Sequence, residues 1–188
     1  MRVIGGKLKG RLIHNPRDKT TRPLKDMVRE SIFDILEHSS IEKIKLKNDI
    51  VLDLFSGSGS FGIECLSRGA KKVYFFENYE PSIKILKKNL KDLGIDKNSV
   101  INEKNAYEIS TENMNIEKFD LIYLDPPFRD KNINKLLTKI LDLKIADKNT
   151  LILLHRNKKF KENFIEKFNI FREKTYGLSK IIFGKLIF

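Results

Sequence analysis

A glycine-rich motif occupies residues 53–62 and reads Asp53-Leu54-Phe55-Ser56-Gly57-Ser58-Gly59-Ser60-Phe61-Gly62. It overlaps the end of an apolar run, residues 50–55, that a single acid interrupts, as is typical of a buried parallel strand. Glycines after a strand permit a tight turn and a close approach of the backbone to a ligand, and a helix that starts there offers free N–H groups. The motif therefore predicts a strand, a ligand-binding loop and a helix in that order.

Strands and helices continue to alternate after this motif. Further strands are predicted near residues 73–76, 99–103, 119–124 and 151–154, and helices near residues 60–68, 81–93 and 133–141. Residues 168–188 predict two more strands, joined through Gly177 with no helix between them. The order predicts an α/β fold with a doubly wound, mostly parallel seven-stranded sheet and an antiparallel C-terminal edge.

A second acid follows the motif where a nucleoside-binding fold requires one. Glu77 ends the next predicted strand, roughly 20 residues beyond the loop, where a carboxylate can accept hydrogen bonds from ribose hydroxyls. A nicotinamide dinucleotide fits this pattern as well. Asp53 favours S-adenosylmethionine, because a carboxylate just before the glycines can meet an ammonium group but opposes a pyrophosphate. The predicted cofactor-binding residues are Asp53, Phe55, Ser56, Gly57, Gly59 and Glu77.

A second motif, Asp125-Pro126-Pro127-Phe128, follows the fourth predicted strand, at the sheet edge where open parallel sheets bind ligands. An exocyclic amino nitrogen of a base is a poor nucleophile because its lone pair is delocalised into the ring. The Asp125 carboxylate and the Pro126 carbonyl, fixed by the adjoining proline rings, can accept both amino hydrogens. Phe128 can stack on the base. The motif predicts methyl transfer to such a nitrogen, with residues 125–128 as the catalytic group.

The charge of the chain indicates a polyanionic partner. There are 37 Lys and Arg against 25 Asp and Glu, and the formal net charge is +12. Residues 1–40 predict a basic extension, made of a hairpin and a helix, before a catalytic domain over residues 41–188. Its predicted RNA contacts are Arg2, Lys7, Lys9, Arg11, Arg22 and Arg29. A merely solvated charged arm, and a local pairing of Arg29 with Glu30, are the alternatives.

Over essentially its whole length the sequence resembles the RsmD-type 16S ribosomal RNA guanine-N2 methyltransferases. The matching stretches are Met1-Arg2-Val3-Ile4-Gly5-Gly6, Gly10-Arg11, Thr21-Arg22-Pro23, residues 26–33, residues 53–62, Leu66-Ser67-Arg68-Gly69-Ala70, Glu77, residues 125–128, His155-Arg156 and Tyr176-Gly177. The resemblance implies a class I, Rossmann-like methyltransferase fold and a guanine N2 target in 16S ribosomal RNA, and a partly assembled small ribosomal subunit is the expected context of that RNA. Many class I enzymes carry an acid near the adenine where this chain has Asn105-Ala106, so these two residues are expected to contact the cofactor.

Several alternatives and exclusions complete the expectations. A DNA adenine-N6 methyltransferase shares the chemistry, and a non-catalytic RNA-binding assembly factor could share the fold. No metal is expected, because the chain has one cysteine, Cys65, and its histidines lack metal-ligand spacing. His155 is interpreted as an ordinary strand-end histidine. The absence of a signal peptide or apolar span predicts a cytoplasmic protein without a membrane, expected to be a monomer.

Overall fold

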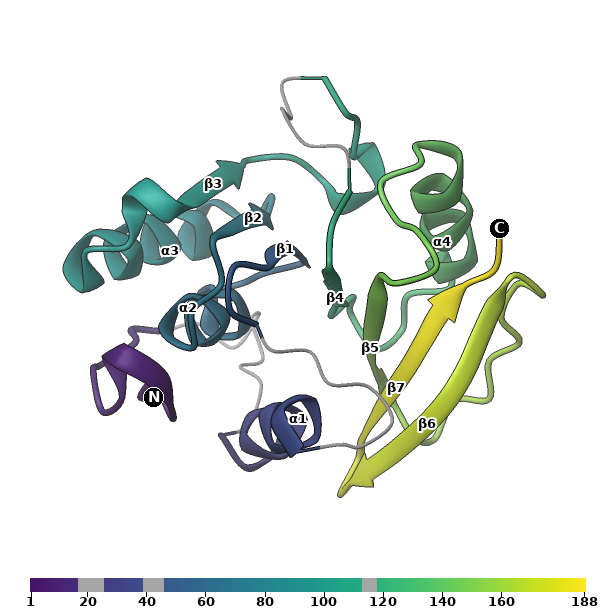
Figure 1. Ribbon diagram of the computed structural model, residues 1–188, viewed down its shortest axis with the longest axis horizontal. Coiled ribbons are helices and arrows are strands. Elements are labelled where there is room, and N and C mark those ends of the chain that lie inside the picture. Colours follow the sequence, from purple (N-terminus) through teal and green to yellow (C-terminus); the bar gives the residue numbers. More distant parts are fainter. Residues whose placement is uncertain (17–25, 39–45, 113–117) are drawn as a thin grey trace.

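The computed structural model describes residues 1–16, 26–38, 46–112 and 118–188, and the predicted RNA contact Arg22 lies outside them. Its seven-stranded sheet has the order β3-β2-β1-β4-β5-β7-β6 (Figure 1). The strands are β1 (Ile50–Leu54), β2 (Lys72–Phe76), β3 (Ser99–Asn102), β4 (Leu121–Leu124), β5 (Leu151–Asn157), β6 (Phe168–Tyr176) and β7 (Ser179–Leu186). The first five run parallel, and β7 pairs antiparallel with both β5 and β6. The predicted fold class is confirmed.

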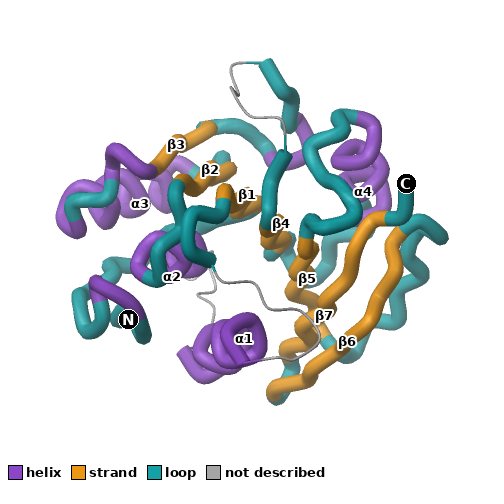
Figure 2. The backbone as a smooth tube through the Cα atoms, viewed as in Figure 1, coloured by secondary structure: helices purple, strands orange, loops and turns teal. Residues whose placement is uncertain are grey.

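Helices cover both faces of the sheet and make three layers (Figure 2). One hydrophobic cluster joins one sheet face to α1 (Asp26–His38), α2 (Ser60–Ser67) and α3 (Glu80–Leu93). A second cluster joins the other face to α4 (Ile133–Asp142) and the 3-10 turn η3 (Ala106–Glu108). Among the described helices, none has the length and apolar character needed to cross a bilayer.

The start of the chain makes the predicted hairpin in a reduced form. The Val3 amide donates to the Arg11 carbonyl at 3.0 Å, and the Ile13 amide donates to the Met1 carbonyl at 2.9 Å. A 3-10 turn, η1 (Gly6–Leu8), closes the hairpin, and a single bridge between Arg2 and Leu12 replaces regular strands. One bridged pair is too short for a strand ladder.

A buried carboxylate attaches this hairpin to helix α2. Glu64 on α2 is fully buried, and its two oxygens accept from the amides of Ile4 at 2.9 Å and Gly5 at 2.7 Å. Arg68 donates to the same carboxylate at 2.9 Å, so the buried charge is paired. Val3 and Ile13 then join the same cluster as α1 and α2. The basic extension therefore shares the hydrophobic core of the sheet.

Arg29 holds the extension from the side of α1, and its predicted contact with RNA is wrong. Its side chain is 0% exposed, and its guanidinium donates to the Arg2 carbonyl at 2.5 Å and to Asp26 at 3.0 Å. Burial lowers the pKa of the Arg29 guanidinium, and the charges of Glu64 and Asp26 oppose that shift. The residue is a structural tie between α1 and the hairpin.

Replacing Arg29 with Ala should therefore destabilise the protein. The change leaves the Arg2 carbonyl without its charged donor inside the protein, so we expect a loss of about 3 kcal/mol in the free energy of unfolding. Urea unfolding measures it. Lys9→Ala, at an exposed position of the same segment, should change stability by less than about 0.5 kcal/mol. Equal stability of the Arg29→Ala variant and the wild type would contradict the assignment.

Candidate functional site

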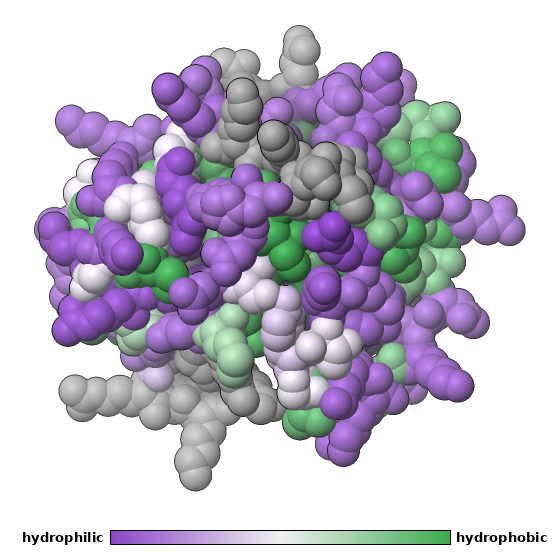
Figure 3. All heavy atoms as spheres, turned by 60° about the horizontal axis from the view of Figure 1, so that its bottom comes forward, coloured by the Kyte–Doolittle hydropathy of each residue, from purple (hydrophilic) through white to green (hydrophobic). Residues whose placement is uncertain are grey.

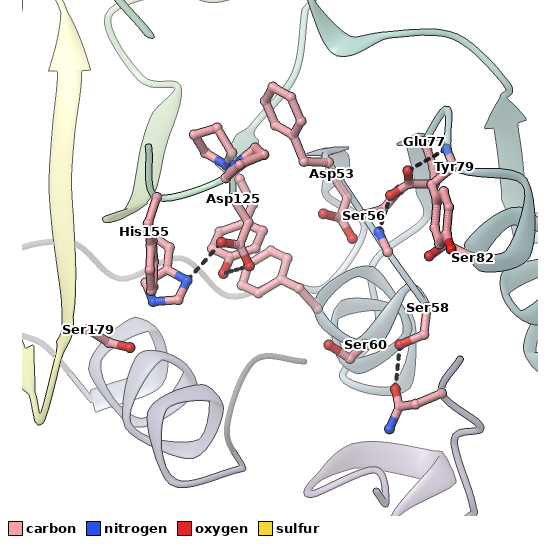
Figure 4. Close-up of a pocket in the computed structure, with 18 of the residues that line it drawn as sticks. Asp53, Ser56, Ser58, Ser60, Glu77, Tyr79, Ser82, Asp125, His155 and Ser179 are labelled. Carbon is pink, nitrogen blue, oxygen red and sulfur yellow. Dashed lines mark hydrogen bonds and ion pairs between the residues drawn. The ribbon is translucent and has the colours of Figure 1, made fainter. Parts of the chain in front are cut away.

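A cavity of about 590 Å³ lies at the carboxyl ends of β1, β2, β4 and β5 (Figure 4). Its walls contain residues 55–58 of the glycine-rich loop, residues 77–79 after β2, residues 125–128 after β4 and His155 on β5. Two segments outside the predicted site complete the walls, residues 15–16 of the extension and residues 176–179 at the β6–β7 turn. Both sequence motifs therefore open into one cavity, as the sheet order requires.

The glycines of the loop are required by its backbone and its packing. Gly57 and Gly59 have φ angles of 56° and 82°, in the left-handed region that favours glycine. A Cβ atom at Gly59 would lie 2.4 Å from the Leu86 side chain, and one at Gly62 would lie 2.3 Å from the Phe75 ring. Gly57 faces the cavity, whereas Gly59 is absent from its walls and supports the turn from behind.

Asp53 is a buried carboxylate with one oxygen still to be satisfied. Its side chain is 1% exposed, and one oxygen accepts from the Gly62 amide at 3.0 Å. The other oxygen is buried in the cavity wall without a partner among the described residues. Burial raises the pKa of Asp53 well above its usual value, the Gly62 amide opposes the rise, and the Asp125 and Glu77 charges add to it. The free oxygen can accept a hydrogen bond from a ligand in the cavity, and a positively charged ligand would favour the ionised form of the carboxyl group.

Glu77 braces the glycine-rich loop from the neighbouring strand. One oxygen accepts from the Gly57 amide at 2.7 Å, and the other accepts from the amides of Asn78 at 2.9 Å and Tyr79 at 2.8 Å. A carboxylate offers about four acceptor sites. The three amides leave Glu77 with capacity for one more donor, and the residue lines the cavity.

Asp125 is held on both of its oxygens. The Nδ1 atom of His155 lies 2.8 Å from one oxygen, and the hydroxyl of Tyr123 donates to the other at 3.2 Å (Figure 4). Tyr123 is itself fixed, because its ring stacks on Phe61 with centroids 3.9 Å apart. Burial raises the pKa of Tyr123 well above its usual value, and the charges of Asp125 and Asp53 raise it further, so its hydroxyl stays a donor. The carboxylate therefore has a fixed orientation in the cavity wall.

The remainder of the Asp-Pro-Pro-Phe motif is supported by β5. Phe128 meets the His155 ring edge to face, with centroids 5.2 Å apart. Arg156, which is 1% exposed, donates to the carbonyls of Pro127 at 3.3 Å and Asp130 at 2.6 Å. Glu162 accepts from the Nε of Arg156 at 2.7 Å and neutralises its charge. Residues 155 and 156 thus fix the loop after β4 from two sides.

The interpretation of His155 as an ordinary strand-end residue is wrong, because its ring holds Asp125. Its other nitrogen, Nε2, is buried without a partner among the described residues. The signal for this contact lies in the register, since Leu124 pairs with Leu154 and the next residues of the two strands are Asp125 and His155. Strand order has to be known before that signal can be used.

Asn105 and Ala106 lie away from the cavity walls. The Asn105 side chain accepts from the Tyr107 amide at 3.0 Å and caps η3, while Ala106 is buried in the second cluster. Their contact with a cofactor stays a prediction. Arg2, Lys7, Lys9 and Arg11 are exposed, as contact with RNA requires, and Arg11 also donates to the Asp92 carbonyl at 3.0 Å.

Comparison with known proteins gives one family and a consistent fold. A family model described as conserved hypothetical protein 95 matches residues 1–185. Ribosomal RNA small subunit methyltransferase D of Haemophilus influenzae is 31% identical over 95% of this chain and 90% of its own. The structure of the Escherichia coli protein yhhF has a TM-score of 0.80, with 25% identity over 99% of this chain and 97% of that chain. An RNA methyltransferase from Salinibacter ruber, solved with S-adenosyl-L-homocysteine, shares the fold with a TM-score of 0.66 and 14% identity, over 88% of this chain and 94% of its own.

The raised pKa of Asp53 leads to a stability prediction. A carboxyl group whose pKa is higher in the fold than in the unfolded chain stabilises the fold at low pH, and this contribution is lost as the pH rises through the folded pKa. Asp53→Asn removes that loss, so the variant should become increasingly more stable than the wild type as the pH rises above about 4, the pKa of an aspartate in the unfolded chain. Thermal unfolding of the ligand-free proteins measures the difference. Asp142→Asn, at an exposed carboxylate, should show no such trend, and a flat difference for Asp53→Asn would refute the buried charge.

Proposed function

This chain belongs to the conserved hypothetical protein 95 family, the RsmD family, and on that premise we propose that it methylates the exocyclic N2 amino group of a guanine in 16S ribosomal RNA, with S-adenosylmethionine as the methyl donor. The family and the names of its relatives support a ribosomal RNA methyltransferase. The observation that carries the proposal is the position of Asp125, an oriented carboxylate in the wall of the cavity that also contains the unsatisfied oxygen of Asp53.

The cavity residues fit the proposed cofactor. S-adenosylmethionine supplies a methyl group on a sulfonium, which makes the carbon electrophilic without help from a metal ion. The unpartnered Asp53 oxygen suits its positive charges, and the spare acceptor site of Glu77 suits a ribose hydroxyl. Gly57 lets the backbone approach the ligand closely. Asp53, Phe55, Ser56, Gly57 and Glu77 all line the cavity.

The Asp-Pro-Pro-Phe loop suits an amino group of a base. Asp125 and the Pro126 carbonyl accept its two hydrogens, which directs the nitrogen lone pair toward the methyl carbon. The nitrogen gains a bond to carbon, the carbon–sulfur bond breaks, and the nitrogen then loses one proton. Asp125 is the acceptor placed for that proton, and His155 and Tyr123 keep its orientation. Phe128, edge to face with His155, offers a ring face to the base.

The choice of substrate separates the proposal from its alternatives. An adenine N6 amino group in DNA offers the same two hydrogens, and an assembly factor would bind RNA without turnover. Exposed basic residues on the extension suit any nucleic-acid substrate, and the names of the relatives favour ribosomal RNA among them. We further propose that the substrate is a partly assembled small subunit and that the protein acts in the cytoplasm as a monomer.

Transfer of a tritiated methyl group tests the proposal directly. The substrates are a 16S RNA transcript, partly assembled small subunits and duplex DNA, each digested to nucleosides afterwards. The proposal expects label in RNA, as N2-methylguanosine. Label in N6-methyladenosine or in DNA would overturn the guanine assignment, and RNA binding without any label would favour the assembly factor.

Variants at Asp125 test its role in the reaction. Asp125→Ala should lower kcat by about 100-fold or more, because it removes an interaction made chiefly in the transition state. Asp125→Asn keeps a weaker acceptor and should retain more activity than Asp125→Ala. His155→Ala should lower kcat by a smaller factor, since His155 acts through Asp125. Single-turnover methyl transfer and calorimetry of cofactor binding should show lowered rates with unchanged affinity. Wild-type rates in Asp125→Ala would place the site elsewhere.

A further inference from the structure

A run of exposed basic residues with an exposed aromatic follows β5. It consists of Lys158, Lys159, Phe160 and Lys161, which we call the basic turn. All four residues are exposed, and Phe160 retains 43% of its surface in contact with solvent. In the described parts of the chain, none of the ion pairs includes a lysine of the basic turn. The segment therefore presents uncompensated positive charge around one aromatic ring.

The backbone of the basic turn is fixed. The side chain of Asn157 accepts from the Lys159 amide at 2.9 Å, and the Asn157 carbonyl accepts from the Phe160 amide at 3.1 Å. The Lys158 amide donates to the Leu178 carbonyl at 2.9 Å. Leu178 lines the cavity, so this bond places the start of the basic turn at the cavity wall. A fixed turn beside a cavity can bind a ligand without first being ordered.

Arg156 joins the basic turn to the Asp-Pro-Pro-Phe loop. Arg156 lies two residues before the basic turn begins. Its guanidinium donates to the carbonyls of Pro127 and Asp130. Nearby acids are occupied, because Glu162 binds Arg156 and the Asp130 carboxylate accepts from the Tyr107 hydroxyl at 2.7 Å. Exposed Arg129 extends the positive charge along the loop itself. The charge of the turn is thus available beside residues 125–128.

The basic turn and the N-terminal extension flank the cavity from different sides. Residues 15–16 of the extension form one part of the cavity wall, and residues 176–179, bonded to the turn, form another. The side of the molecule that carries α1 and the β6–β7 turn comes forward in Figure 3, where hydrophilic side chains cover most of the face and hydrophobic groups show between them. A strand whose base enters the cavity would continue past both segments.

We infer that the basic turn is a second RNA-binding surface, which holds the strand next to the target base. Its lysines contact phosphates, and Phe160 stacks on a neighbouring unpaired base, a combination typical of single-stranded nucleic-acid sites. Stacking requires an unpaired neighbour, so the preferred substrate is a loop or an unpaired strand and not a continuous duplex. The inference rests on the proposed function, since it takes the target to be RNA.

Binding of a 16S RNA transcript across a salt series tests the charged part. Lys159→Glu with Lys161→Glu should weaken binding by about tenfold and reduce the slope of log K against log salt by about 2. The matched control is Lys97→Glu with Lys148→Glu, which makes the same change in net charge at exposed positions. These two residues precede β3 and β5, at the amino ends of the strands, whereas the cavity lies at the carboxyl ends. It should leave the slope unchanged. Equal losses of RNA affinity in both double variants would mean that only the net charge matters, and would refute the basic turn as an RNA-binding surface.

Phe160 variants test the stacking part. Phe160→Ala should weaken RNA binding by about 5-fold to 100-fold, whereas Phe160→Tyr should keep wild-type affinity because the ring face remains. Melting temperature and calorimetric binding of S-adenosylmethionine should stay unchanged in every variant, since the four residues are exposed. Wild-type affinity in Phe160→Ala would overturn the stacking role. Losses seen with assembled subunits but not with the transcript would assign the turn to a protein contact and overturn the inference.

The wild-type protein separates this inference from the proposed function. If it transfers no methyl group to RNA and binds the transcript without salt dependence, the proposed function fails. If it methylates the RNA and its affinity falls with salt, but the variants of the basic turn behave like the wild type, the function stands and the second surface alone is refuted.

Discussion

The parallel pairing of β1 with β4 is the constraint on which the site depends. Leu54 pairs with Leu124, and the Asp125 amide donates to the Leu54 carbonyl at 3.2 Å, so the two strands end at the same level. Chain connections leave this point in opposite directions, toward β2 on one side and β5 on the other. The loops diverge and leave the cavity between them. Glu77 lines the cavity from the end of β2, the strand next to β1, and His155 lines it from β5, the strand next to β4.

Much of this arrangement could be predicted from the sequence, for identifiable reasons. Periodicity and glycine placement predicted the strands, the helices and the antiparallel edge, because those signals are local. Asp53, Glu77 and residues 125–128 could be placed in one cavity, because parallel strands end at a common edge. Contacts that depend on register could not be predicted: His155 against Asp125 requires knowing that β5 lies beside β4. The predicted contact of Arg29 with RNA was wrong, because charge patterning cannot distinguish an exposed arginine from a buried one that donates to a backbone carbonyl.

Buried charge is handled in two different ways in this molecule. Glu64 and Arg29 each have an oppositely charged partner and hydrogen bonds to the backbone of the extension, and the Nε atom of Arg29 is buried without a partner among the described residues. Asp53 keeps one oxygen unsatisfied, and burial holds its pKa high. Unsatisfied groups of this kind are usually found where a ligand completes them.

The position of β7 has a consequence for how the chain folds. The last strand lies between β5 and β6, so β6 has no place in the sheet until β7 has formed. The two strands pair over eight positions with only a short turn between them, and can form a local hairpin before they dock on β5. Docking brings residues 176–179 to the cavity and Tyr176 to Ser31 on α1, 145 residues earlier in the chain. During synthesis the cavity is therefore completed last, and a nascent chain that still lacks its final strand has no finished binding site.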